Sequence, residues 1–129
     1  MSKNFLEIKN VSFRAGGKTK VKNVSFNIEN KGDIICLLGP SGVGKTTILR
    51  TIAGLEKIKS GSIKLKDNIL SSSKDHIEPE NRHISFSFQE NSLFPHYTVE
   101  KNIYLGAVAK KIKGKKKINP KKIIKLLNI

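Results

Sequence analysis

Residues 39 to 46 read Gly39-Pro40-Ser41-Gly42-Val43-Gly44-Lys45-Thr46, and they match the phosphate-binding pattern G-x-x-x-x-G-K-[ST] at every fixed position. The five residues before them, 34–38, form a short apolar run rich in strand formers. The residues after them, 46–53, carry apolar side chains at helical spacing. Strand, glycine loop and helix therefore follow in the order that the pattern requires, and the stretch predicts a ligand that carries phosphate groups.

The residue types of this loop suit a phosphate. Glycines at 39, 42 and 44 permit backbone conformations that a side chain would block, so that successive amide N–H groups can point inward. A helix that begins near Lys45 adds free amides and the positive end of its dipole. We expect Lys45 to reach the β- and γ-phosphates and the Thr46 hydroxyl to ligate a bridging Mg²⁺. The alternative is a glycine-rich turn that fits the pattern by chance.

Length and charge limit the other possibilities. The chain has 129 residues, enough for one domain, with 25 basic and 10 acidic residues and a formal net charge of +15. Residues 101–129 hold ten lysines and no acid. Such a basic segment raises the question of nucleic acid or anionic lipid. Because the segment contains no arginine and no aromatic residue after Tyr104, it also fits solvated helix faces in a chain rich in lysine and asparagine.

The single cysteine and the N-terminus indicate a reducing compartment. Cys36 lies in the apolar run before the loop, so we expect a small buried hydrophobic residue, with no disulfide or thiolate metal site. The first residues contain no signal-peptide core, and no apolar run approaches the roughly 20 residues of a membrane-spanning helix. The expected location is therefore the cytoplasm.

Hydrophobic periodicity predicts an α/β chain. Two alternating segments joined by a glycine turn favour a hairpin, Gly54 is expected to end the helix after the loop, and Asn119-Pro120 is expected to start the last helix. In order, the expected elements are strands at 5–13, 21–28 and 34–38, a helix at 46–53, a strand around Ile63, a polar loop at 71–81, a strand at 83–88, and helices from Thr98 to about Lys111 and from Pro120 onward.

The most specific stretch after the loop is Phe88-Gln89-Glu90-Asn91-Ser92-Leu93-Phe94-Pro95-His96-Tyr97-Thr98-Val99-Glu100-Lys101-Asn102-Ile103. Together with Leu38 to Glu56, it resembles the N-terminal half of an ATP-binding-cassette (ABC) ATPase subunit of the importers for small solutes. The resemblance implies a P-loop NTPase fold of class α/β, an incomplete ABC ATP-binding domain whose mixed sheet has N-terminal antiparallel strands and a phosphate-loop helix. It places the nucleotide-binding core at 1–89, and the glutamine-loop segment with the start of a truncated helical subdomain at 90–129.

The resemblance also implies a set of site residues and partners. Gln89 matches a glutamine that reaches Mg²⁺ and senses the γ-phosphate, and Glu90 to Thr98 matches the surface that docks a transmembrane permease subunit. Gln89 could instead be an ordinary polar residue at a strand end, and Leu93 to Tyr97 a loop that packs its own aromatic rings. A second ATP-binding subunit is expected, at the inner face of the cell membrane, and no specific nucleic acid. The expected nucleotide contacts are Gly39, Pro40, Ser41, Gly42, Val43, Gly44, Lys45, Thr46, Thr47 and Gln89, with Thr46 and Gln89 on the metal.

One departure from the family pattern concerns the base of the nucleotide. The aromatic residue that stacks on adenine in this family corresponds here to Ala15. Phe13 could replace it, or could belong to the hydrophobic core. Selectivity for ATP over GTP therefore does not follow from the sequence.

A second departure concerns hydrolysis. No four-residue apolar run is followed by an acid, no Leu-Ser-Gly-Gly-Gln occurs, and the three histidines all precede the place of a switch histidine. Phosphoryl transfer to water needs metal, phosphate clamp and water-positioning base together, so we expect no turnover by this chain alone. In the family, the strands that carry these groups lie between those at 34–38 and 83–88, so we expect an open flank there.

The function that the sequence predicts is an ATP-binding subunit, or a fragment of one, that binds Mg-ATP to energise solute import. The alternatives are a non-catalytic nucleotide-binding or interaction remnant, and an ABC-type ATPase that acts on nucleic acid. The solute cannot be read from the sequence.

Overall fold

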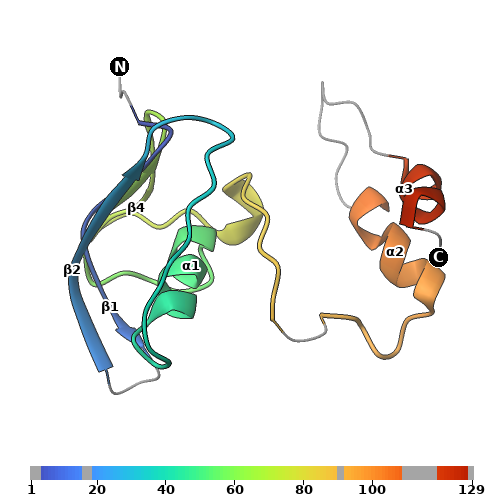
Figure 1. Ribbon diagram of the computed structural model, residues 1–129, viewed down its shortest axis with the longest axis horizontal. Helices are drawn as coiled ribbons and strands as arrows, with labels where there is room; N and C mark the ends of the chain where they lie inside the picture. Colours follow the sequence, from blue (N-terminus) through green and yellow to red (C-terminus); the bar gives the residue numbers. More distant parts are fainter. Residues whose placement is uncertain (1–3, 16–18, 90–91, 109–118, 128–129) are drawn as a thin grey trace. The chain divides into compact units, whose positions relative to one another are not determined.

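The computed structural model describes residues 4–15, 19–89, 92–108 and 119–127 (Figure 1). They belong to two compact units, Met1–Ser87 and Phe88–Ile129, and each unit is described by itself below.

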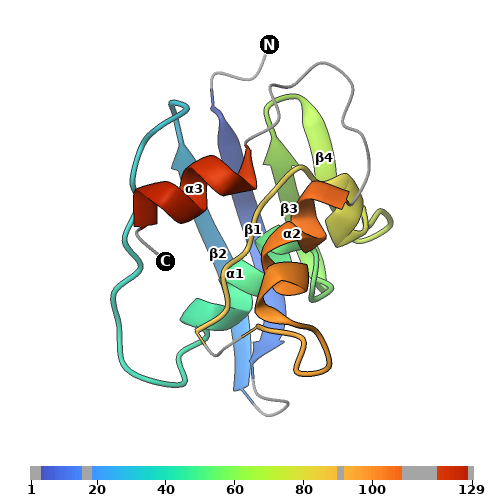
Figure 2. The ribbon, with the colours of Figure 1, turned by 90° about the vertical axis from the view of Figure 1, so that its right-hand side faces the viewer.

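The first unit is a four-stranded sheet with one helix against a face. Its strands are β1 (Leu6–Ala15), β2 (Thr19–Ile28), β3 (Ser60–Leu65) and β4 (Asn68–Ser71), in the order β2-β1-β3-β4. Each neighbouring pair is antiparallel. Helix α1 (Lys45–Ala53) lies in front of the strands in Figure 2, and a short 3₁₀ helix, η1 (Pro79–Asn81), follows β4.

The predicted hairpin is confirmed, and it has a local symmetry. The tetrapeptide Asn-Val-Ser-Phe occurs at 10–13 in β1 and again at 23–26 in β2, and the two valines pair across the hairpin. Each asparagine has a left-handed backbone, with φ of 50° at Asn10 and 56° at Asn23, where the strands bulge. Each asparagine N–H donates to the serine of the other strand, Ser25 Oγ at 2.8 Å and Ser12 Oγ at 3.2 Å respectively. The repeat thus fixes the hairpin register from both sides.

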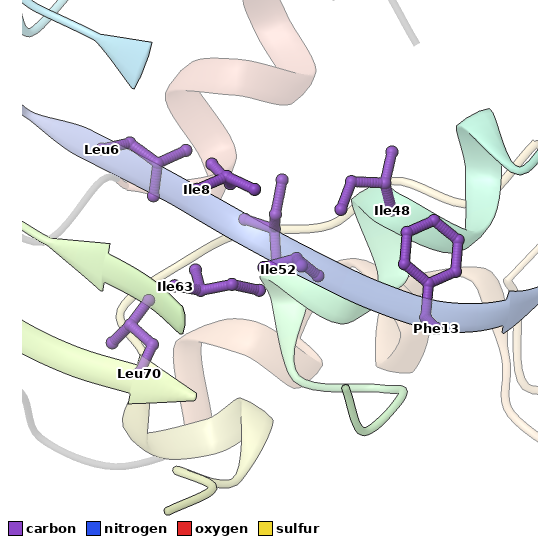
Figure 3. Close-up of a cluster of buried hydrophobic side chains, with 8 residues drawn as sticks. Leu6, Ile8, Phe13, Ile48, Ile52, Ile63 and Leu70 are labelled. Atoms are coloured by element: carbon purple, nitrogen blue, oxygen red, sulfur yellow. The ribbon is translucent and has the colours of Figure 1, made fainter. Parts of the chain in front are cut away.

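The core lies between α1 and the sheet. Figure 3 shows Ile48 and Ile52 of α1 pointing toward side chains of β1, β3 and β4. Ile63 of β3 is fully buried. Burying such apolar side chains is the main favourable term in folding. The buried cluster consists of Leu6, Ile8, Val11, Phe13, Ile48, Ile52, Ile63 and Leu70.

Helix α1 begins and ends where the sequence predicted. Its C-terminal end is Gly54, whose left-handed φ of 89° a residue with a side chain rarely adopts. The Gly54 N–H donates to the Thr51 carbonyl at 3.2 Å, and the Leu55 N–H donates to the Arg50 carbonyl at 2.9 Å. These two bonds satisfy carbonyls that the last helical turn leaves without a partner.

The two strands predicted at 34–38 and 83–88 are not formed, so the expected mixed sheet is wrong and the described sheet is wholly antiparallel. A strand forms as part of a hydrogen-bonded sheet, and the four-stranded sheet of the described residues includes neither segment. Ile34 is 94% exposed and Leu38 is 88% exposed, which confirms the expected open flank. Cys36 is exposed as well, so the prediction that it is buried is also wrong.

Strand β4 was not predicted, because residues 68–71 read only as the approach to a polar loop. Lys66 and Asp67 form the turn between β3 and β4, with Lys66 at a left-handed φ of 54°. Leu70 then enters the core and Ser71 is fully buried.

The second unit contains two helices. The helix expected from Thr98 is α2 (Val99–Val108), capped by the Thr98 hydroxyl, which accepts from the Lys101 N–H at 3.2 Å. Its expected extension to Lys111 lies outside the described residues. The last helix is α3 (Pro120–Leu127), and Asn119 Oδ1 accepts from the Lys121 N–H at 3.0 Å, which confirms the predicted cap.

Candidate phosphate-binding site

The glycine loop has the backbone that the pattern predicts. Gly39, Gly42 and Gly44 have φ of 152°, 78° and 106°. Side chains strongly disfavour such conformations, and glycine adopts them freely. Ser41 to Gly44 turn directly into α1. The loop is therefore shaped by its three glycines.

The loop ends in the N-terminus of α1. Gly44 is the residue before the helix, and it provides no side-chain cap. Its carbonyl accepts the first helical bond, from the Ile48 N–H at 2.9 Å. The amides of Lys45, Thr46 and Thr47 occupy the first turn, where an α-helix offers them no carbonyl partner. The first turn carries no acidic residue, so this end of the dipole favours an anion.

The Lys45 side chain lies over the loop. Its Nζ donates to the Gly39 carbonyl at 2.6 Å and to the Pro40 carbonyl at 2.7 Å. These contacts hold a positive charge at the mouth of the turn that the three glycines form. An ammonium group, the amides of the first helical turn and the Thr46 hydroxyl thus belong to one short segment. This donor set fits a phosphate chain, with an oxygen ligand for Mg²⁺.

The loop rests on the hairpin. A Cβ added at Gly44 would lie 3.0 Å from Val21 Cγ2 and 3.2 Å from Phe13 Cε2. Phe13 is only 2% exposed and belongs to the core. Of the two interpretations left open, the structure therefore supports Phe13 as a core residue that lies beneath Gly44, and Phe13 is not available to stack on a base.

A buried arginine at the other end of α1 was missed in the sequence. Arg82 follows η1 and is 1% exposed. Its NH1 donates to the Thr51 carbonyl at 2.9 Å and to the Ile52 carbonyl at 3.0 Å. Its Nε donates to the Ile77 carbonyl at 2.6 Å, and its NH2 donates to Ser71 Oγ at 2.7 Å. The guanidinium thus joins the last turn of α1 to β4 and to the loop after it.

Two further groups surround this guanidinium. NH2 lies 3.2 Å from His76 Nδ1, and because a guanidinium only donates, that nitrogen must accept. Burial lowers the pKa of Arg82, and the carboxylate of Glu78 acts in the opposite direction. Since every polar atom of the guanidinium has a partner, the buried charge is compensated.

Gln89 lies in the other unit. It is exposed and belongs to Phe88–Ile129, whereas residues 39–47 belong to Met1–Ser87. Its expected contact with Mg²⁺ and the γ-phosphate stays a prediction.

The segment predicted to dock a permease is partly described, because Glu90 and Asn91 lie outside the described residues. Its rings form a cluster: the centroid of Tyr97 lies 5.4 Å from that of Phe94 and 4.4 Å from that of His96. Lys101 Nζ lies 5.1 Å from the Tyr97 centroid. Leu93 is 68% exposed and Phe94 is 46% exposed. The segment thus packs its own rings, as the alternative interpretation had it, and still presents apolar surface.

The Asn102 side chain binds this segment at several points. Asn102 of α2 accepts from the Phe94 N–H through Oδ1 at 2.8 Å. Its Nδ2 lies within donating distance of three carbonyls, those of Phe94 (3.2 Å), Tyr97 (3.2 Å) and Thr98 (3.1 Å). No sequence pattern indicated this role, because asparagine within a helical pattern is not a specific signal.

Two further properties of the described residues bear on other site chemistry. Among them, no group of three or more His, Cys, Asp or Glu side chains could hold a metal ion. Within the same ranges, no helix has the length and apolar character needed to cross a membrane.

Comparison with known proteins yields a family match. The profile of the family described as ABC transporter matches residues 21–129. The spermidine/putrescine import ATP-binding protein PotA of Pasteurella multocida is 38% identical over 111 residues, which is 86% of this chain and 29% of that protein. PotA of Pseudomonas aeruginosa is 47% identical over 103 residues, which is 80% of this chain and 27% of that protein. The Fe(3+) ions import ATP-binding protein FbpC of Fusobacterium nucleatum is 38% identical over 125 residues, covering 96% and 32%. The chain thus spans less than a third of the length of these relatives.

Proposed function

The chain belongs to the ABC transporter family, and from this membership we propose that it provides the ATP-binding part of an importer subunit. The observation that carries the proposal is the glycine loop at the N-terminus of α1, with Lys45 Nζ held over the Gly39 and Pro40 carbonyls. The names of the relatives support the importer assignment, since each contains the words import ATP-binding protein.

In the proposed complex, residues 39–47 hold the phosphates of ATP. Lys45 turns from its two carbonyl partners toward the β- and γ-phosphates, and the amides of the first turn of α1 bind the phosphate oxygens. The Thr46 hydroxyl and the Gln89 side-chain oxygen are the proposed ligands for Mg²⁺, which would neutralise phosphate charge when bound. Discrimination between ATP and GTP should be weak, because Phe13 is buried and Ala15 has no ring.

The proposed partner is a transmembrane permease subunit that docks on Glu90 to Thr98. The exposed Leu93 and Phe94 support this, since apolar and aromatic side chains on a surface loop suit a protein interface. A complete family member would also pair with a second ATP-binding subunit, at the inner face of the cell membrane. The names of the relatives include polyamine and Fe(3+) import, so similarity alone does not choose the solute.

Calorimetric titration with Mg-ATP tests the proposal. Lys45→Ala should abolish binding, because it removes the cation held over the loop. The matched control is Lys64→Ala, which also removes one positive charge, but from a β3 side chain that pairs with Glu7 at 3.8 Å. Lys64→Ala should bind as the unaltered chain does. Equal affinity in Lys45→Ala and Lys64→Ala would refute the nucleotide-binding function.

The nucleic-acid alternative has its own test. Binding to duplex DNA should be non-specific and should fall steeply with salt, as expected for a lysine-rich surface. Sequence-specific retention at physiological salt would favour that alternative over import.

A further inference from the structure

Arg82 has no part in the proposed nucleotide site, yet it is the one fully buried charged residue among those whose burial the structure describes. Two of its donors end at the Thr51 and Ile52 carbonyls, in the last turn of α1. A cation there faces the negative end of the helix dipole. Phosphate would bind at the opposite, positive end of the same helix.

Helix α1 is thereby held at both ends through glycines. At the N-terminal end, Gly44 packs tightly against Val21 and Phe13, because an added Cβ would lie 3.0 Å from Val21 Cγ2 and 3.2 Å from Phe13 Cε2. At the C-terminal end, a Cβ on Gly54 would overlap the Arg82 guanidinium, with Nε as its nearest atom and Cζ at 2.9 Å. The arginine therefore lies directly on the backbone that ends the helix, and it fills the space that the glycine leaves.

The guanidinium is itself fixed from several elements. Its partner Ser71 is the last residue of β4. Two more partners, the Ile77 carbonyl and His76 Nδ1, belong to the loop that follows β4. A planar guanidinium offers five N–H donors in a rigid fork. Shifting the end of α1 away from this group would break the two charge-assisted bonds to the Thr51 and Ile52 carbonyls together, while the remaining bonds keep the guanidinium on β4 and its loop.

We infer that Arg82 is a positioning residue for the phosphate loop: it fixes the tilt of α1 on the sheet, and thereby the place of the loop at the other end. The inference rests on the proposed function. A nine-residue helix is about 13 Å long, so a tilt of about 5° at Gly54 moves the Lys45 end by about 1 Å. A displacement of that size is enough to impair a site that relies on several convergent donors.

Two substitutions test the inference without touching the loop. Arg82→Lys keeps the positive charge and removes the planar guanidinium with its five N–H donors. Gly54→Ala keeps Arg82 but places a methyl group where the guanidinium lies. The matched control is Gly32→Ala, because Gly32 also has a left-handed φ, of 103°, while an added Cβ there meets nothing within 4 Å. Gly32→Ala therefore carries the backbone strain alone.

The readout is the Kd for Mg-ATP of the folded molecules, measured at low temperature, with the folded fraction of each variant determined by amide hydrogen exchange. We expect Arg82→Lys and Gly54→Ala each to weaken binding about tenfold or more, and Gly32→Ala to stay within about twofold. In the double variant, the two losses should not add, because both displace the same group. If a variant does not fold, Ser71→Ala takes its place; it removes one acceptor of Arg82 and should weaken binding about threefold.

If Arg82 had only a structural role, its substitution would lower the melting temperature and leave the Kd of the folded molecules unchanged. Affinities within twofold of the unaltered chain for Arg82→Lys, Gly54→Ala and Ser71→Ala would thus overturn the inference while the proposed function stands. Failure of the unaltered chain to bind Mg-ATP would overturn both.

Discussion

Replacing Asn102 by aspartate should loosen the segment proposed to dock a permease. The substitution keeps the shape of the side chain and the oxygen that accepts from the Phe94 N–H. It replaces the Nδ2 donor by a second carboxylate oxygen, which then faces the carbonyls of Phe94, Tyr97 and Thr98. The orientation of the amide is fixed, because only an oxygen can accept from the Phe94 N–H.

The magnitude follows from the contacts. Nδ2 has two hydrogens, so about two hydrogen bonds are lost among the three carbonyls, at about 1 kcal/mol each. Water restores part of the lost hydrogen-bond free energy, because Asn102 is only half-buried. Repulsion between the new carboxylate and the carbonyls adds to the loss. We expect a local destabilisation of about 1 to 3 kcal/mol, which corresponds to a roughly 5- to 150-fold loss of protection against amide exchange.

The assay is amide hydrogen exchange at Tyr97, whose N–H donates to the Phe94 carbonyl at 3.0 Å within this segment. The matched control is Asn119→Asp, because among the described residues Asn119 caps α3 through its Oδ1, and aspartate caps a helix equally well. Asn119→Asp should leave exchange unchanged. Equal exchange at Tyr97 in the two variants would show that Asn102 does not hold the segment.

Two further substitutions test the core and the docking surface. Ile63→Ala, at a fully buried position, should destabilise the first unit by about 2 to 5 kcal/mol. Ile69→Ala, at a position 44% exposed on the adjacent strand, should destabilise it by about 1 kcal/mol or less. Protection of the β1 amides against exchange measures both effects, and equal losses would contradict the core described here. Phe94→Asp should reduce solute uptake by a transporter assembled with its permease and leave Mg-ATP affinity unchanged, while a parallel loss of both would indicate a packing role for the ring.

Local patterns allowed a large part of the fold to be predicted. The hairpin of β1 and β2 and the ends of α1 depend on alternation and on the Gly54 cap, which are properties of adjacent residues. The starts of α2 and α3 follow from Thr98 and Asn119-Pro120 for the same reason. The phosphate loop is the strongest case, because its three glycines and Lys45 occur within eight residues.

The remaining features depend on partners that sequence periodicity does not reveal. Residues 34–38 have the composition of a buried strand, yet no described strand pairs with them, and Cys36 is exposed. Arg82 reads as one more surface cation until its contacts with α1, β4 and His76 are seen. The contacts of Asn102 span eight residues, outside any helical or strand period.

Mapping the contacts of Mg-ATP on the amide NMR signals of the chain tests the central claim most directly. We predict that the largest shifts on titration fall within residues 39–47, with Gly42, Gly44 and Thr46 among them, and that adenosine without phosphates produces none of these shifts. Shifts confined to the lysine-rich residues 110–125, or equal shifts with adenosine, would contradict the claim that the glycine loop binds the phosphates of a nucleotide.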